Sequence, residues 1–498
     1  MNSPLICMTL TGKTLEEDIK LVKKYQKQTD IVELRVDHLA EEEQLYVKKF
    51  PALINLPCIL TIRRDVDGGL FTGGEFSRTN LFGRALAFAN PDRSKNFAFV
   101  DFEEDYHIPS IEDAAMAFGV RIIRSYHNMT EPVPNLKEHC QTMRKTGFEI
   151  PKIAFMPHSL SDVLNMFKEG ENMTQYEHIF CAMGVEGLPS RLLSAFTNSF
   201  LTYVSPEETL GNTAAIGHID PVTLNDVYHF HSISKNTGLY GITGWPLAKT
   251  PGLKILNKGF AEHNIDSVYL PVRTKLVSES LNFCEQVGFR GLCVEHPFKE
   301  SVLYYLNEQS NDVVQTGSCD TLVRKNNKWT GYNTDCIGFK KALNEFLGFL
   351  SLKRKKVAVL GSGGTAKALV YVLKQMGAKV CIFDKVLEHA QFLADKYGFE
   401  SCQLDPYCAE KLDEYSFLII QAINTENEKN LADFEEEDPL YFYNFRGNEL
   451  LFDAASSYFS PVMKRASLAG CKVCNGNKMT EYKACEQFAL FTGQNIEV

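Results

Sequence analysis

The sequence has no uninterrupted apolar stretch of about 18 residues, no basic leader followed by an apolar run, and no internal repeat. The first absence excludes an ordinary membrane-spanning helix, and the second argues against a secretory signal. Basic residues are not in excess either, because the formal net charge is −10. Such an acidic balance argues against nucleic acid as the main partner. We therefore expect a cytoplasmic protein with neither nucleic acid nor a membrane as partner.

Fourteen cysteines are present, but they show neither zinc-ligand spacing nor the pattern of a disulfide framework. We expect them to be reduced thiols, mostly in the core. The chain has 498 residues, 44% of them hydrophobic and 23% charged, as in ordinary globular proteins. A chain of this length is too long for one core, so we expect about two or three domains.

Short apolar runs alternate with polar, helix-like stretches over the first 230 residues, a pattern typical of parallel βα units. The runs are ICMTL (6–10), IVELRV (31–36), CILTIR (58–63), FAFVDFE (97–103), VRIIRSY (120–126), KIAFM (152–156), IFCAM (179–183) and SFLTYV (199–204). Eight such units predict a closed (β/α)8 barrel. The alternative is an open, doubly wound sheet.

A barrel should carry its chemistry at the carboxyl ends of its strands. Polar side chains do follow the runs there: Glu33, Arg35 and Asp37 within or just after the second, Arg63 ending the third, Asp101 and Glu103 ending the fourth, His127 after the fifth, Lys152 in the sixth and Arg191 after the seventh. We expect these side chains to converge on one barrel mouth.

Lys152 is the most unusual of these residues, because it stands in the apolar segment EIPKIAFM (149–156). A lysine at a strand end usually extends its ammonium into solvent and has no further role. Alternatively, an amine kept partly neutral by burial can attack a carbonyl and form a Schiff base.

Six segments decide between these readings: ELRVD (33–37), TIRRDVDGG (61–69), VDFE (100–103), SYHN (125–128), IPKIAFMP (150–157) and MGVEGLPSR (183–191). In this order and spacing they resemble type I 3-dehydroquinate dehydratase over residues 1–230. The resemblance implies a (β/α)8 barrel and a Schiff-base dehydration that needs no metal and no cofactor.

The resemblance also implies residue roles. Lys152 would form the imine, and His127 would act first as base and then as acid. Asp101 and Glu103 would position these two residues and tune their pKa values, and Arg191 would hold the substrate carboxylate. Further substrate contacts would come from Glu33, Arg35, Arg63 and Met183. Three positions depart from the family pattern: Asp67 replaces a glutamate, and in a late loop Ala214 replaces a serine and His218 a glutamine.

A glycine-rich turn lies between a strand and a helix in VAVLGSGGTAKALV, a context typical of dinucleotide binding. Together with HPFKE (296–300), GYNTDCIG (331–338) and the closing GNKM…EQF helix, it makes residues from about 237 onward resemble shikimate dehydrogenase. We expect a substrate domain at 237–345, closed by the terminal helix (475–498), and a Rossmann domain at 346–474. The cofactor would contact Gly361, Ser362, Gly363, Gly364 and Thr365.

The two catalytic residues of that family are present as Lys299 and Asp335, a pair that can relay a proton as hydride arrives. An interdomain salt bridge is the alternative reading of this pair. The substrate shell differs more, with Thr250 in a changed serine segment, Glu295 for threonine, Asp320 for asparagine and Lys483 for glutamine. Asp320 and Lys483 could form a new pair.

The cofactor signal is mixed. Asp384 and Lys385 stand where the family has an NADP-binding Asn-Arg pair. A carboxylate there accepts hydrogen bonds from the NAD ribose and repels a 2′-phosphate. The resemblance favours NADP, whereas the local chemistry favours NAD.

The two halves fit one pathway, because the product of the first reaction is the substrate of the second. The sequence thus predicts a bifunctional shikimate-pathway enzyme that acts on 3-dehydroquinate, 3-dehydroshikimate and shikimate. Two alternatives are a second half that acts on a related compound such as quinate with NAD, and a non-catalytic metabolite sensor.

Overall fold

The computed structural model describes residues 3–87, 90–211, 217–247, 251–423, 438–454 and 458–497. The chain forms two compact units. The first comprises Met1–Gly238, Asp266–Thr274 and Glu279–Val287, and the second comprises Leu239–Ile265, Lys275–Ser278 and Gly288–Val498. Within the described residues, no helix combines the length and the apolar character that crossing a membrane requires.

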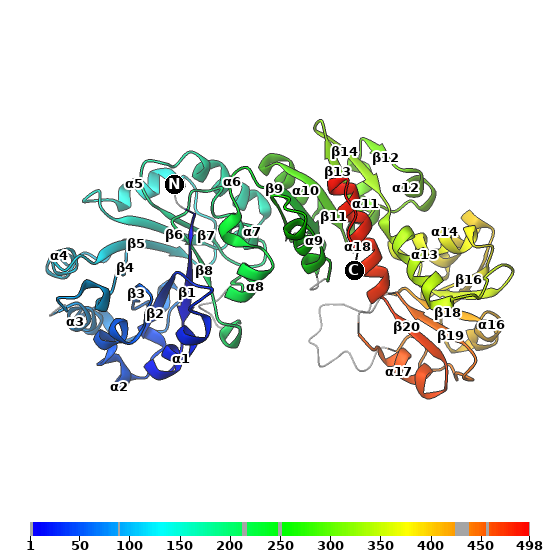
Figure 1. Ribbon diagram of the computed structural model, residues 1–498, viewed down its shortest axis with the longest axis horizontal. Helices are drawn as coiled ribbons and strands as arrows, with labels where there is room; N and C mark the ends of the chain where they lie inside the picture. The colour runs from blue at the N-terminus through cyan, green and yellow to red at the C-terminus, as the bar shows by residue number, and fades with distance from the viewer. Residues whose placement is uncertain are drawn as a thin grey trace. The chain divides into compact units, whose positions relative to one another are not determined.

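The first unit is built on an eight-stranded parallel sheet with the order β7-β6-β5-β4-β3-β2-β1-β8, so β1 and β8 pair and the sheet curls into a barrel (Figure 1). An isolated parallel bridge between His178 and Ser199 joins the last gap, between β7 and β8. The barrel prediction is confirmed, and the open sheet is excluded. The strands are β1 (Leu5–Leu10), β2 (Ile31–Arg35), β3 (Cys58–Thr61), β4 (Phe99–Glu103), β5 (Arg121–Asn128), β6 (Ile150–Phe155), β7 (Ile179–Ala182) and β8 (Leu201–Val204).

Strands β2, β4 and β6 are wholly buried, since one face meets the barrel interior and the other meets the surrounding helices, whereas both ends of β5 are partly exposed. Interior side chains such as Cys7, Ile31, Ile59 and Ile123 fill the barrel below the polar mouth. The helices of this unit are α1 (Leu15–Tyr25), α2 (Glu41–Gln44), α3 (Gly74–Leu86), α4 (Pro109–Ala117), α5 (Leu136–Met143), α6 (Leu160–Glu171), α7 (Leu188–Leu192) and α8 (Pro221–Asp226).

Two six-stranded sheets follow along the chain. The first has the order β10-β9-β11-β13-β14-β12 and is mixed, because β13 runs antiparallel to both β11 and β14. Its strands are β9 (Gly238–Thr243), β10 (Ser267–Pro271), β11 (Phe289–Val294), β12 (Glu308–Gln309), β13 (Thr321–Lys325) and β14 (Lys328–Tyr332). The helices that precede or connect them are α9 (Pro251–Glu262), α10 (Val277–Val287), α11 (Phe298–Ser301) and α12 (Asn311–Thr316).

The second six-stranded sheet is entirely parallel, with the order β17-β16-β15-β18-β19-β20. Its strands are β15 (Lys356–Leu360), β16 (Lys379–Asp384), β17 (Glu400–Gln403), β18 (Leu418–Gln421), β19 (Leu450–Asp453) and β20 (Lys472–Asn475). The strand order reverses beside β15, which makes its carboxyl end the topological switch point where such sheets bind ligands. The associated helices are α13 (Thr334–Leu347), α14 (Gly364–Gln375), α15 (Leu387–Tyr397), α16 (Ala409–Glu414) and α17 (Pro461–Leu468).

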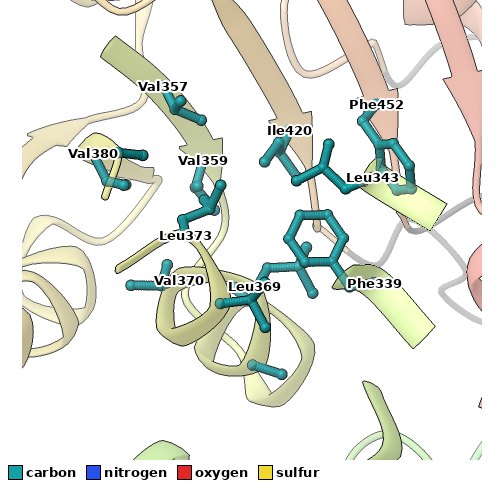
Figure 2. Close-up of a cluster of buried hydrophobic side chains, with 14 of the residues drawn as sticks. Phe339, Leu343, Val357, Val359, Leu369, Val370, Leu373, Val380, Ile420 and Phe452 are labelled. Atoms are coloured by element: carbon teal, nitrogen blue, oxygen red, sulfur yellow. The ribbon is translucent and has the colours of Figure 1, made fainter. Parts of the chain in front are cut away.

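Helices α13 and α14 cover one face of this sheet through a continuous apolar core (Figure 2). Phe339 and Leu343 of α13 meet Phe452 of β19, while Leu369 and Leu373 of α14 lie against β15. The terminal helix α18 (Asn477–Thr492) packs against α13 and α9. Its Phe488 contacts Phe260, so the last helix of the chain returns to the mixed sheet.

Candidate functional sites

Lys152 lies inside the barrel and not in solvent, with only 5% of its surface exposed. Its register places it opposite Ser125 of the neighbouring strand β5. Its Nζ is 3.0 Å from Asp101 Oδ2, 3.7 Å from Glu33 Oε1 and 4.4 Å from the centre of the Tyr203 ring. The structure thus holds the ammonium among two carboxylates and an aromatic face.

Asp101 is the fully buried counter-ion of that lysine. Its other oxygen lies 2.8 Å from Arg63 Nη2 and accepts a 2.5 Å hydrogen bond from the Ser125 hydroxyl. Burial alone would raise the pKa of Asp101, but the charges of Arg63 and Lys152 hold it well below its ordinary value. Asp101 is therefore a permanent anion under the lysine.

We expected Glu103 to help position His127 and Lys152, and in the structure its carboxylate forms ion pairs with two arginines. Arg63 Nη1 lies 2.6 Å from one of its oxygens and Arg78 Nη1 lies 2.5 Å from the other. Arg78, on α3, is itself fully buried. Glu103 thus fixes Arg63, and through Arg63 it supports Asp101.

His127 lies within β5 and not after it, as the sequence had suggested. Its ring lines the same pocket as Lys152. Desolvation, together with the charges of Arg63 and Lys152, lowers its pKa well below the ordinary value of 6.5. Its Nδ1 is buried and has no hydrogen-bond partner in the part of the chain that the structure describes. The ring is therefore neutral near pH 7 and able to accept a proton.

Two further ion pairs frame the mouth. Arg35 donates two hydrogen bonds to Asp37, 2.9 and 2.7 Å long, and both residues are buried. Asp67 accepts a 2.6 Å hydrogen bond from Arg64 Nε, and burial raises its pKa despite that arginine. Arg63, which the sequence placed at the end of the third strand, follows β3, which ends at Thr61.

The opposite wall of the pocket comes from the last strands. Arg191, on α7, is buried and lines the pocket, and desolvation lowers its pKa. His218 hydrogen-bonds Ser205 through Nδ1 at 2.7 Å and stacks on Tyr203. The full lining is Thr9, Glu33, Arg35, Arg63, Asp67, Gly68, His127, Met129, Lys152, Ala154, Cys181, Met183, Arg191, Tyr203 and His218. This pocket therefore combines a lysine, a neutral imidazole and arginines that can bind an anion.

A second cluster lies in the second unit, at the start of helix α13. Lys299 Nζ is 2.6 Å from Asp335 Oδ2, 3.3 Å from Glu295 Oε2 and 3.1 Å from Thr365 Oγ1. Burial would lower the pKa of Lys299, but the carboxylates of Asp335 and Glu295 raise it above its ordinary value. The same contact with Lys299 helps to lower the pKa of Asp335, which burial alone would raise.

The suggested pairing of Asp320 with Lys483 is wrong. Lys483 Nζ lies 2.7 Å from Glu295 and 3.1 Å from Asp335. Asp320 instead accepts hydrogen bonds from the Thr321 and Thr334 hydroxyls and from the backbone N–H groups of Thr334 and Asp335. Because the N-terminus of α13 presents those free N–H groups, it attracts this carboxylate more directly than the lysine does. Thr250 lies outside the described residues.

The glycine-rich turn joins β15 to α14 beside Lys299. Gly361 has φ +101°, and a Cβ on Gly364 would come within 3.0 Å of the Lys299 Cβ, so both positions require glycine. A Cβ on Gly363 would meet no atom within 4 Å. No side chain caps α14, so its first N–H groups face this open space. The turn fits a dinucleotide pyrophosphate.

At the end of β16, Asp384 accepts hydrogen bonds from the Ser362 hydroxyl at 2.6 Å and from the Val386 N–H at 3.0 Å. The Asp384 carboxylate thus points toward the glycine-rich turn, which contains Ser362. Lys385 is exposed beside it. The region offers one acceptor and one cation to the adenosine end of a dinucleotide.

Comparison with known proteins agrees with these two sites. Residues 6–235 match the family Type I 3-dehydroquinase, and residues 242–322 match the Shikimate dehydrogenase substrate binding domain. The chain therefore combines a type I 3-dehydroquinase domain with a shikimate dehydrogenase domain.

Some relatives align over almost the whole chain and others over about half of it. The bifunctional 3-dehydroquinate dehydratase/shikimate dehydrogenase, chloroplastic, of Arabidopsis thaliana is 27% identical over 99% of this chain and 82% of its own. A shikimate dehydrogenase (NADP(+)) of Maridesulfovibrio salexigens is 29% identical over 53% of this chain and 95% of its own. The solved structure of dehydroquinate dehydratase and shikimate dehydrogenase from S. pombe AroM covers 99% of this chain and 96% of its own, at 22% identity and a TM-score of 0.40.

Several residues of the two sites did not stand out in the sequence as site residues. Ser125 and Tyr203 lie on strands, where alternation alone does not distinguish a pocket-lining side chain from a core one. Glu295 was noticed only as a departure from a family motif, yet it contacts both lysines of the second cluster. The unusual charge at that position was the signal that could have identified it.

Proposed function

We propose that this protein is a bifunctional shikimate-pathway enzyme. Its barrel dehydrates 3-dehydroquinate to 3-dehydroshikimate through a Schiff base, and its second unit reduces that product to shikimate with NADP(H). The observation that carries the proposal is the burial of Lys152 beside Asp101, in the pocket that His127 also lines. A buried lysine, a neutral imidazole and a buried arginine in one pocket match imine chemistry on an anionic substrate.

In the dehydration, the Lys152 amine attacks the C3 carbonyl of the substrate, and the carbonyl oxygen leaves as water. The resulting protonated imine draws electrons from C2, whose proton moves to the neutral His127. That proton then goes to the departing C1 hydroxyl, which leaves as a second water. Hydrolysis of the imine consumes one water and restores Lys152, so one water is lost overall. Asp101 stabilises the positive charge of the imine throughout, and Arg191 holds the substrate carboxylate.

Around this core, Glu33, Arg35, Arg63, Asp67, Met183 and His218 form the remaining substrate contacts. Support comes from their place in the wall of one pocket. Asp101 and Glu103 act behind that wall, since they form ion pairs with the lysine and the arginines and are not among the lining residues of the pocket.

In the reduction, NADPH bound at the glycine-rich turn would supply the hydride that the ketone carbon accepts. Lys299 donates a proton to the ketone oxygen, and Asp335 holds the Lys299 ammonium in place at 2.6 Å. Thr365 couples this pair to the cofactor turn, because its hydroxyl accepts a hydrogen bond from the same ammonium. The pyrophosphate would be bound by the backbone of Gly361 to Gly364.

We further propose a division of the chain into a dehydratase barrel at 1–230, a substrate domain at 237–345 closed by residues 475–498, and a Rossmann domain at 346–474. The return of α18 to α9 and α13 supports the assignment of the terminal helix.

One observation favours a second candidate for the reductase half. Asp384 presents a carboxylate where a 2′-phosphate would lie, which favours NAD and leaves oxidation of a related compound such as quinate as the alternative. A metabolite sensor is the less supported reading, because it would not need the intact proton-transfer pairs at both sites.

Borohydride trapping tests the first activity. Incubation with 3-dehydroquinate and borohydride should add the mass of the reduced substrate to the protein at Lys152. In parallel, turnover of 3-dehydroquinate with NADPH or with NADH should yield shikimate, and quinate oxidation with NAD should be slower. Absence of any adduct or turnover would favour the sensor.

A further inference from the structure

The dehydrogenase site contains a second lysine–carboxylate pair that interlocks with Lys299 and Asp335. Lys483 Nζ is 2.7 Å from Glu295 Oε1 and 3.1 Å from Asp335 Oδ1. Lys299 Nζ is 3.3 Å from Glu295 Oε2 and 2.6 Å from Asp335 Oδ2. Each carboxylate thus uses one oxygen for each ammonium, and the four groups close a ring of alternating charge.

The ring joins three segments that are far apart in the sequence. Glu295 directly follows β11, four residues before Lys299 on α11, while Asp335 stands in the first turn of α13 and Lys483 on α18. Gly338, one turn beyond Asp335, makes the approach of α18 possible. A Cβ at that position would lie 2.7 Å from the Met479 carbonyl oxygen and 3.1 Å from the Lys483 backbone N. The close packing of α13 on α18 therefore brings the second ammonium to Asp335.

Because these side chains are mostly buried, their ion pairs have larger energetic effects than ion pairs at the surface. The exposed fraction of the side chain is 2% for Asp335, 8% for Lys299, 11% for Lys483 and 30% for Glu295. A charge removed from water in this way needs a partner, and loss of one partner leaves the other uncompensated. The four residues should therefore behave as one unit.

We propose that Glu295 and Lys483 are positioning residues of the reduction, which set the charge states of Lys299 and Asp335 as a coupled pair. This inference rests on the proposed reductase function. Lys483 keeps Asp335 ionised, so that Asp335 remains the acceptor for Lys299. Glu295 keeps Lys299 charged, so that Lys299 enters each turnover as the proton donor.

The charges of Glu295 and Lys483 have opposite effects on the pKa of Lys299, which supports separate roles for these two residues. The charge of Glu295 raises the pKa of Lys299, whereas the charge of Lys483 lowers it and also lowers that of Asp335. Other titratable groups also interact with the ring, and among them are the buried thiols of Cys319, which interacts with Lys299, and of Cys336, which interacts with Asp335. Asp320, before β13, interacts with Asp335 and with both lysines, and His296 lies next to Glu295 and interacts with Lys299.

The hydrogen bonds of the Lys299 ammonium also support this proposal. An ammonium has three N–H donors, and the ammonium of Lys299 donates hydrogen bonds to Asp335 and Thr365 and lies 3.3 Å from Glu295 Oε2 as an ion pair. When Lys299 gives a proton to the substrate, its amine becomes neutral, and Asp335 loses this positive charge beside its carboxylate. Lys483 remains as the cation that stabilises the Asp335 carboxylate in this state.

The test is the pH dependence of kcat for reduction of 3-dehydroshikimate by NADPH, measured on Glu295→Gln, Lys483→Met and the double variant. Without Lys483, the pKa of Asp335 rises, so the acidic limb should move to higher pH by about 1–3 units. Without Glu295, the pKa of Lys299 falls, so the basic limb should move to lower pH by about 1–3 units. In the double variant, the basic limb should lie between those of Glu295→Gln and wild type.

Lys478→Met is the matched control, because Lys478 is on the same helix and pairs with Glu481 in solvent. It should leave both limbs in place, and all variants should keep wild-type dehydratase activity. Single variants that lose thermal stability or kcat but keep both limbs would show a merely structural ring and overturn the proposal, while the proposed function stands. If the wild-type protein reduced no 3-dehydroshikimate with NADPH or with NADH, both the proposed function and this inference would be wrong.

Discussion

At the scale of single residues, the proposed dehydratase activity of the barrel depends on Lys152, since the imine would form on its amine. Lys152→Ala should abolish dehydration of 3-dehydroquinate and leave reduction of added 3-dehydroshikimate nearly unchanged. Both rates are measured on the same preparation. Lys168→Ala, an exposed lysine on α6, serves as the control and should keep both activities. Dehydratase activity near wild type in Lys152→Ala would contradict the Schiff-base assignment.

His127 has a separate task, so its removal should slow proton transfer without preventing imine formation. His127→Ala should lose about 10²- to 10⁴-fold in dehydratase kcat. Borohydride should still trap the substrate on the variant, as judged by the mass of the protein. A variant that gives no adduct would mean that His127 is needed for imine formation itself.

The lowered pKa of His127 also predicts a pH dependence. The active form is the neutral base, which is lost as pH falls through the pKa of the folded protein. Because that pKa lies well below 6.5, dehydratase kcat/KM should persist at pH values where an ordinary histidine is protonated. An acidic limb at about pH 6.5 or above in wild type would contradict the neutral, desolvated state.

At the scale of elements, the turn after β15 and the end of β16 together decide the choice of cofactor. Asp384→Asn removes one negative charge from the end of β16, where we expect the 2′-phosphate of NADPH to lie. It should shift the ratio of kcat/KM for NADPH to kcat/KM for NADH in favour of NADPH, by an amount that corresponds to about 1–2 kcal/mol. Both cofactors are compared on wild type and variant at fixed 3-dehydroshikimate. An unchanged ratio would show that the carboxylate, which Ser362 also binds, does not face the ribose.

Helix α1 contains a buried carboxyl whose ionisation opposes folding. Asp18 is fully buried, Oδ1 accepts from the Gly12 N–H at 2.9 Å, and Oδ2 has no partner among the residues that the structure describes. Desolvation raises the pKa of Asp18 to about 7. The folded state therefore binds this proton more tightly than the unfolded state does, and stability is lost as pH rises from about 4 to about 7.

Asp18→Asn removes that charge and keeps an acceptor for Gly12. It should raise the free energy of unfolding of the barrel by about 1–3 kcal/mol at pH 8 and change it little below about pH 4. Denaturant unfolding at the two pH values measures the difference. Equal effects at both would mean that the gain comes from packing and not from ionisation.

At the scale of the whole molecule, each site draws its described residues from one unit. The barrel pocket uses residues of Met1–Gly238, and the lysine ring uses residues of Gly288–Val498. Lys299→Met should therefore convert 3-dehydroquinate to 3-dehydroshikimate and stop there, even with NADPH present. Accumulation of 3-dehydroshikimate is the measurement, and parallel loss of dehydration would show that the two sites depend on each other.

The sequence by itself determined the barrel, the parallel sheet with its glycine-rich turn, and which two lysines are the candidates for catalysis. Strands buried on two faces read as apolar runs, and a glycine-rich turn between strand and helix needs only local geometry, so both signals are contained in short segments. The position of Lys152 within a strand was readable for the same reason, because a single charge interrupts a run of apolar residues.

Only the tertiary structure decided how the charged side chains pair. Glu103 forms ion pairs with Arg63 and Arg78, and Lys483 forms ion pairs with Glu295 and Asp335 and not with Asp320. These partners come from different strands and helices, and their choice depends on distances of a few ångströms. In the case of Lys483, the packing of α18 against Gly338 sets that distance. Coulomb energy in a buried site falls steeply with separation, so pairing follows packing, which composition and motif order do not encode.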